Sequence, residues 1–132
     1  MTPFGMKVRE LRAGRNVTLK EMADELHISS AYLSALEHGK RGRPSAQLIR
    51  QICGYFGIIW DEAEELERLA DLSHPKVTLD TSDLSPKATE LANRLANSIH
   101  ALDEAVIDRL LTALGDHGGE RGAEAKRRAG RR

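Results

Sequence analysis

The feature that most constrains this chain is the run of residues 18–39, where two short helix patterns follow each other with almost no room between them. The first opens with Thr18 and Glu21 in capping-box spacing, in which the hydroxyl caps the backbone and the carboxylate reaches back. It ends near His27, a residue type that tolerates the left-handed conformation of a tight turn. Ser29 can cap the second helix, and Gly39 can end it. Helices this short are stable only when packed, so the run predicts a small helical domain around a tight turn.

Composition supports an all-α chain. Of 132 residues, 40% are apolar, but only two are Phe, two Tyr and one Trp, so the core must be mostly aliphatic. Abundant Glu, Arg and Lys favour helices over strands. The length allows one compact domain with an appendage. We predict a five-helix domain over residues 1–72, a linker over 73–84, a helical hairpin over 85–115 and a disordered basic tail over 116–132.

Helix patterns flank the central run on both sides. A helix is expected from Pro3 to Gly14 before it, and another starts at Pro44 or Ser45 after it. A fifth helix is expected from residue 61, with acidic residues in its first turn. In the C-terminal half, Ser85 and Asp103 can cap two more helices, the last ending at residue 115. Residues 76–79 between these halves could instead pair as a short strand.

The formal net charge of zero hides a strong asymmetry along the chain. Residues 1–58 carry nine Lys or Arg against five Asp or Glu, residues 59–115 carry five against twelve, and residues 116–132 carry six against three. The N-terminal domain is therefore suited to a polyanion, whereas the acidic middle is not.

Several classes of function find no support. No apolar run approaches the length of a membrane span, and the N-terminus lacks a secretory signal. The single Cys53 excludes an internal disulfide and fits a buried thiol. The five histidines show no metal-ligand spacing, and no catalytic constellation stands out. We therefore expect no membrane association, no cofactor, no metal and no enzyme activity, in a cytoplasmic protein that is nucleoid-associated when bound to DNA.

A helical wheel separates two faces on the helix expected over residues 29–38. Leu33 and Leu36 point inward, and Glu37 lies on the same side, so its charge needs a partner. The outward face is small and neutral or polar and carries no carboxylate; it consists of Ala31, Ser34, Ala35 and His38. Such a face can enter the major groove of DNA without repelling phosphate.

Residues 8–56 resemble the phage-repressor-like (Xre/Cro) helix-turn-helix family. The matching elements are Arg9-x-Leu11-Arg12, Thr18-x-x-Glu21-Met22-Ala23-x-x-Leu26, Ser29-x-x-x-Leu33-Ser34-x-Leu36-Glu37-x-Gly39, and Pro44-Ser45 with the apolar helix after it. The resemblance implies the five-helix domain, insertion of helix 29–38 into the major groove, and an ion pair between Arg12 and Glu37. One departure is Leu19, where family members often carry a Gln that contacts DNA.

The candidate DNA contacts fall into two groups. The first group is the candidate base-reading residues. Ser30, Ala31 and Ala35 match the positions of the family's base readers, and Tyr32 lies at the edge of the same face. None of the small residues among them can make bidentate base contacts, so we expect methyl contacts and DNA shape to contribute to specificity. The candidate phosphate contacts are Thr18, Lys20, Ser34, Lys40, Arg41 and Arg43. The last three could also form only a solvated loop.

The sequence leaves two functions open. The first is a transcriptional regulator, a homodimeric repressor that reads a palindromic operator in double-stranded DNA. The candidate dimerisation residues are Trp60, Leu66, Leu91, Leu95, Ile99, Leu110 and Leu114. The second is an antitoxin or adaptor whose acidic helices bind a protein partner, with DNA binding used for autoregulation. The C-terminal helices could also pack back on the N-terminal domain, and the basic tail could add DNA affinity or solubility.

Overall fold

The computed structural model describes residues 1–115, and this part of the chain contains seven α-helices, one 3-10 turn and no strand. The predicted all-α class is confirmed, and the short strand considered for residues 76–79 does not form. The chain divides into two compact units, Met1–Thr78 and a second that begins at Leu79. The tail predicted over 116–132 lies outside the described residues.

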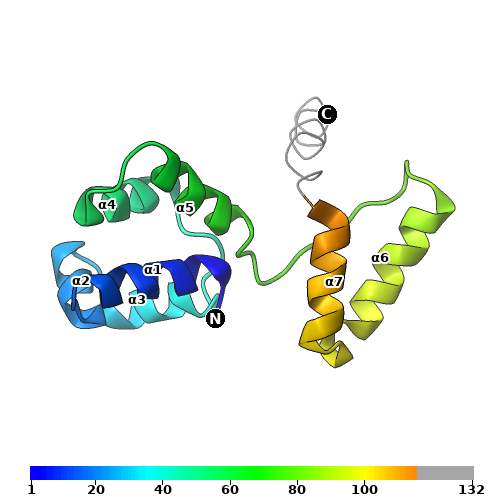
Figure 1. The fold of residues 1–132 in the computed structure, drawn as a ribbon, viewed down its shortest axis with the longest axis horizontal. Coiled ribbons are helices and arrows are strands. Elements are labelled where there is room, and N and C mark those ends of the chain that lie inside the picture. Colours follow the sequence, from blue (N-terminus) through cyan, green and yellow to red (C-terminus); the bar gives the residue numbers. More distant parts are fainter. Residues whose placement is uncertain (116–132) are drawn as a thin grey trace. The chain divides into compact units, whose positions relative to one another are not determined.

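The first unit, called the head below, consists of five helices: α1 (Pro3–Gly14), α2 (Leu19–Glu25), α3 (Ser30–Glu37), α4 (Ala46–Phe56) and α5 (Asp61–Asp71) (Figure 1). Side-chain hydroxyls cap the first four at their N-termini, and each accepts a hydrogen bond from a backbone N–H inside the helix; the caps are Thr2, Thr18, Ser29 and Ser45. Left-handed residues end α2 and α4, namely His27 at φ 58° and Gly57 at φ 65°. Local capping chemistry thus sets most of the boundaries.

The core of the head is aliphatic with two phenylalanines, as the composition requires. Its buried members are Phe4, Val8, Met22, Ala23, Leu26, Leu33, Leu36, Leu48, Ile49, Ile52, Phe56, Leu66 and Ala70. All five helices contribute, so α5 is an integral part of the head. The prediction that Leu66 lies on the surface for dimerisation was wrong. Its side chain is 0% exposed because it faces the core, whereas Trp60 is 80% exposed.

Ser73 fastens the end of α5 to the start of α1. Its hydroxyl accepts a hydrogen bond from the Phe4 N–H at 2.9 Å and donates one to the Leu69 carbonyl at 2.6 Å. The side chain is buried, although its place in the sequence predicted the start of the linker. A polar group can be buried here because both hydrogen-bonding functions of the hydroxyl are used.

The second unit contains α6 (Pro86–Ser98), the 3-10 turn η1 (Ile99–Ala101) and α7 (Glu104–Leu114). Ser85 and Asp103 cap the two helices as predicted. The helices meet at η1 and separate towards their other ends (Figure 1). No residue between positions 79 and 115 is buried, so this hairpin has no core of its own in the part described.

No helix among the described residues is both long enough and apolar enough to span a bilayer.

Candidate nucleic-acid interface

Two buried pairs hold α2 and α3 in the head and decide which face of α3 is exposed. Met22 and Ala23 of α2 and Leu33 and Leu36 of α3 are all buried. The opposite side of α3 reaches solvent: Ser30, Ala31 and His38 are exposed, and Tyr32, Ser34 and Ala35 are partly exposed. The structure thus gives α3 the two faces that the helical wheel predicts.

Glu37, the only carboxylate of α3, is neutralised inside the head. Its side chain lies on the inner side and accepts two hydrogen bonds from Arg12 Nη2 of α1, at 2.7 Å to Oε1 and 3.0 Å to Oε2. The residue is only 2% exposed. Charge-assisted contacts of this kind are strong, and they keep the negative charge away from the outer face. The exposed face of α3 therefore carries no carboxylate.

The backbone of Glu37 is a second anchor, because it receives the N-terminus of α1. Its carbonyl oxygen accepts hydrogen bonds from the backbone N–H of Thr2 at 3.1 Å and from the Thr2 hydroxyl at 3.3 Å. A Cβ added at Gly5 would lie 2.6 Å from the Glu37 carbonyl carbon and 2.7 Å from its Cα. Only glycine allows α1 and α3 to approach this closely. The C-terminal end of α3 is thus fixed through both main chain and side chain.

The candidate phosphate contacts differ in how the head already uses them. The Thr18 hydroxyl caps α2 and donates to Glu21 Oε1 at 3.1 Å. Arg43 forms a 2.7 Å ion pair with Asp71 of α5 and donates to the Pro44 carbonyl. Lys20 and Lys40 are exposed, and Ser34 is partly exposed. Among these candidates, Lys20 and Lys40 are therefore exposed cations, whereas the Arg43 charge already has a partner.

Arg41 extends the exposed face of α3. Its guanidinium carbon lies 5.8 Å from the centre of the Tyr32 ring, within the range of a cation–π contact. The arginine is exposed, so the contact holds a positive charge beside the N-terminal half of α3 without removing it from solvent. Sequence spacing alone could not reveal this pairing, since nine positions separate the two residues.

Two further contacts could not be predicted from the sequence. Arg15, the residue that follows α1, donates to the Tyr55 and Phe56 carbonyls at the C-terminus of α4, and its guanidinium lies 5.6 Å from the Phe56 ring centre. Asp71, the partner of Arg43, is the last residue of α5, and nothing in its sequence position marks it as the partner of an arginine 28 residues earlier. Both arginines lie between helices, and basic residues at such positions are too common for the sequence to predict their partners.

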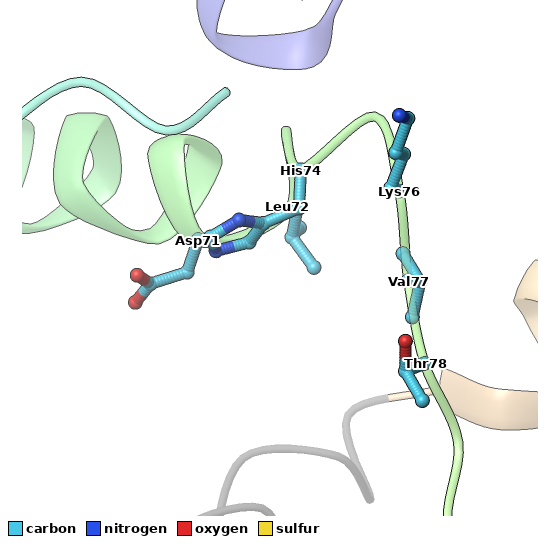
Figure 2. A pocket seen from close by; sticks show the side chains of 6 residues that line it. All are labelled: Asp71, Leu72, His74, Lys76, Val77 and Thr78. Atoms are coloured by element: carbon cyan, nitrogen blue, oxygen red, sulfur yellow. The ribbon is translucent and has the colours of Figure 1, made fainter. Parts of the chain in front are cut away.

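A hollow beside the end of α5 is a further feature of the head. The hollow of about 430 Å³ beside the end of α5 is lined by Asp71, Leu72, His74, Lys76, Val77 and Thr78, and its polar side chains point in different directions (Figure 2). The described residues contain no group of three or more His, Cys, Asp or Glu placed to hold a metal. Burial, together with the Glu67 charge, raises the pKa of the Cys53 thiol, so this thiol stays protonated near neutral pH.

A family model described as a helix-turn-helix domain matches residues 5–71, the span that contains α2, α3 and their supporting helices. The chain belongs to this helix-turn-helix family. The match ends with α5, in agreement with the burial of Leu66 and Ala70 in the head core.

Relatives of the head are HTH-type transcriptional regulators. The chain is 38% identical over 61 residues to the transcriptional regulator RghRB of Bacillus subtilis, covering 46% of this chain and 44% of the relative. It is 35% identical over 71 residues to the transcriptional activator BcrR of Enterococcus faecalis, covering 52% and 34%. It is 36% identical over 52 residues to the transcriptional repressor RghR of B. subtilis, covering 39% and 38%.

The matches therefore span less than half the length of each of these relatives. No solved structure matches the chain significantly.

Proposed function

We propose that this protein is a sequence-specific transcriptional regulator that inserts α3 into the major groove of DNA. One observation on α3 carries the proposal. Its outer face is exposed, and its single carboxylate, Glu37, is buried against Arg12. An unpaired carboxylate on this face would be repelled by the phosphates of both groove walls, so its burial favours the approach of α3 to DNA. The exposed Lys20, Lys40 and Arg41 add positive charge at the head.

We propose that this face of α3 recognises DNA bases through few hydrogen bonds and several methyl contacts. Ser30 and Tyr32 can hydrogen-bond to base edges, while the methyl groups of Ala31 and Ala35 can contact thymine. Because none of these side chains makes a strong bidentate contact, sequence-dependent DNA shape supplies part of the specificity.

The mode of regulation proposed is repression, in which a homodimer on a palindromic operator occludes a promoter. One head covers only a half-site, and a two-fold dimer reads two half-sites about 34 Å apart. The names of the relatives include both an activator and a repressor. We propose repression because occlusion of a promoter requires only that the protein binds DNA, whereas activation also requires a contact with the transcription machinery.

Selection from a random double-stranded DNA library, followed by footprinting at about 150 mM salt, tests the function directly. We expect an enriched, two-fold symmetric motif and a footprint that covers both half-sites. Footprints on the promoter of the protein's own gene would then show whether it occludes the polymerase site. Recovery of unenriched sequences would exclude sequence-specific binding.

Changing Ala31 to Glu is expected to weaken binding to the selected site at least about 100-fold, because a carboxylate would face phosphates and base acceptors in the groove. Fluorescence anisotropy with a labelled duplex measures the effect. Ala105→Glu places the same charge on an exposed position of α7 and should leave half-site affinity unchanged. Equal losses in both variants would exclude α3 as the reading helix. Ser30→Ala and Tyr32→Phe should lower the ratio between selected and scrambled sites.

Removing one exposed cation beside α3 should lower affinity for selected and scrambled DNA alike. For Lys40→Ala and Arg41→Ala, we expect the slope of log K against log salt to fall by about 1 each. Lys76→Ala, in the segment after α5, serves as the matched control and should leave the slope unchanged. An unaltered slope for both Lys40 and Arg41 variants would show that the connector is only a solvated loop.

A further inference from the structure

The connector between α3 and α4, residues 39–45, carries three cations, and the head already binds one of them. Lys40 and Arg41 are exposed. The Arg43 side chain is only 26% exposed, and its Nε donates a hydrogen bond to Asp71 Oδ1 at 2.7 Å. Its Nη1 donates to the carbonyl of the buried Pro44 at 2.8 Å. Arg43 is therefore held against the head, while its two basic neighbours remain available to a polyanion.

The connector lies where DNA phosphates are expected if α3 enters the major groove. Helix α3 has eight residues and is thus about 12 Å long, which is comparable to the width of the groove. The connector follows directly, and a hydrogen bond of 2.9 Å joins the Lys40 N–H to the Ala35 carbonyl. Gly39 and Gly42 adopt left-handed conformations at φ 77° and 75°, which turn the chain at the end of α3. A phosphate at the groove wall would therefore meet the cations of this segment.

Asp71 cannot follow Arg43 towards a phosphate, because the end of α5 is fastened to the head. Two residues after Asp71, the buried Ser73 hydroxyl accepts a hydrogen bond from the Phe4 N–H of α1 at 2.9 Å. The Asp71 carboxylate points away from Lys76 in the segment that follows α5 (Figure 2). A change of partner would therefore move the arginine side chain and leave the carboxylate in place.

The Arg43–Asp71 pair can open at little cost, unlike the Arg12–Glu37 pair. The side chains of Arg12 and Glu37 are 13% and 3% exposed, so separating them would leave buried charges. Asp71 is 47% exposed, so water can solvate its carboxylate once the arginine leaves. The arginine fork fits a phosphate as well as a carboxylate, because both present oxygen acceptors to its planar set of N–H donors. Phosphate and Asp71 are thus alternative partners for one cation.

We propose that Asp71 is an internal competitor of DNA, which pairs with Arg43 in the free protein and gives it up to a phosphate in the complex. The carboxylate occupies the place of a phosphate oxygen, and the two anions repel each other when both are near the guanidinium. Binding must therefore break this pair, so Asp71 lowers the affinity of the head for every DNA sequence. The inference rests on the proposed function and deepens it, since it names a residue that sets how strongly the same site binds.

Replacing Asp71 by asparagine removes the charge and keeps the shape of the side chain. At about 150 mM salt, Asp71→Asn should bind selected and scrambled duplexes about 2- to 5-fold more tightly than the unmodified chain, as measured by fluorescence anisotropy. Glu65→Gln is the matched control, because it removes the same charge from α5 and breaks a 2.8 Å ion pair with Arg68. Salt screens the long-range effect of a lost charge, so this control should change affinity by less than about 1.5-fold. Unchanged or weaker binding by Asp71→Asn would overturn the proposal.

Arg43→Ala shows whether the gain depends on this arginine. Alone, it should lower the slope of log K against log salt by about 1, as expected for the loss of one phosphate contact. Combined with Asp71→Asn, it should abolish the gain, so that the double variant binds like Arg43→Ala. An unchanged slope for Arg43→Ala would overturn the proposal, as would an equal gain from Asp71→Asn with and without the arginine.

Nuclear magnetic resonance of the Arg43 Nε–Hε group follows the exchange in the unmodified chain, so this readout does not depend on the folding of a variant. The resonance should shift when duplex is added, and a resonance that keeps its free position in saturating duplex would overturn the proposal. If both duplexes bind equally while Asp71→Asn still raises both affinities, the proposed sequence-specific function is contradicted and the competition is supported. If the selected duplex is preferred but Asp71→Asn has no effect, only the competition is contradicted.

Discussion

Replacing Gly5 by alanine is expected to lower the free energy of unfolding of the head by about 3 kcal/mol, the upper part of the range for overpacking, because the added Cβ meets backbone atoms rather than a flexible side chain. The added Cβ would lie 2.6 Å from the carbonyl carbon of Glu37 and closer still to its oxygen. Helix α1 must then move away from α3, which also breaks the hydrogen bonds between Thr2 and the Glu37 carbonyl. Urea denaturation followed by circular dichroism measures the loss.

Gly14→Ala in the same helix is the matched control. A Cβ at Gly14 would meet no atom within 4 Å, so this substitution should be neutral or stabilise by up to about 1 kcal/mol through helix propensity. Opposite signs for two Gly→Ala changes in one helix would isolate the close approach at Gly5. A neutral Gly5→Ala variant would show that α1 and α3 can separate without cost.

Breaking the Arg12–Glu37 pair from either side should cost about 3–5 kcal/mol, because each substitution leaves a charge with little access to water. The two side chains are 13% and 3% exposed, so Arg12→Met, which leaves the more buried carboxylate behind, should cost the most. Because α3 is held by this pair, the single variants should also bind DNA more weakly. Thermal or urea denaturation together with half-site affinity measures both effects.

Two further variants distinguish the effect of losing the ion pair from the effect of changing either residue alone. Arg12→Met combined with Glu37→Met removes both charges and should recover most of the lost stability. Glu10→Ala, which removes an exposed partner of Lys7 from α1, should change stability by less than about 1 kcal/mol. Additive losses in the double variant would show that the two residues act independently.

The prediction of the head from sequence succeeded where local chemistry decides the structure. A cap needs only a hydroxyl or carboxylate before a helix, so Thr18, Ser29, Ser85 and Asp103 could be predicted from their position alone. The same holds for the left-handed turn at His27. The two faces of α3 also follow from periodicity, because 3.6 residues per turn place Leu33 and Leu36 together.

The sequence predicted which residues of α3 face outward, but it did not predict the partners of the charged side chains around α3. Periodicity put Glu37 on the inner side, while its pairing with Arg12 came from the family resemblance and is present in the structure. That Arg43 is held by Asp71, and that Arg41 lies over Tyr32, depends on how separate helices pack. The spacing of residues along the sequence does not predict which side chains of different helices and loops come into contact.

The run of residues 18–39 therefore determined by itself the type of unit, the limits of the two short helices within the run and the outward face of α3. Only the tertiary structure decided that Leu66 belongs to the core, that Ser73 joins α5 to α1, and that Gly5 admits the backbone of Glu37. The physical reason is the distance along the sequence over which each interaction acts. Capping and helical periodicity act within a few residues, whereas burial and close backbone approach depend on chain segments far apart in the sequence, such as Thr2 with Glu37 and Phe4 with Ser73.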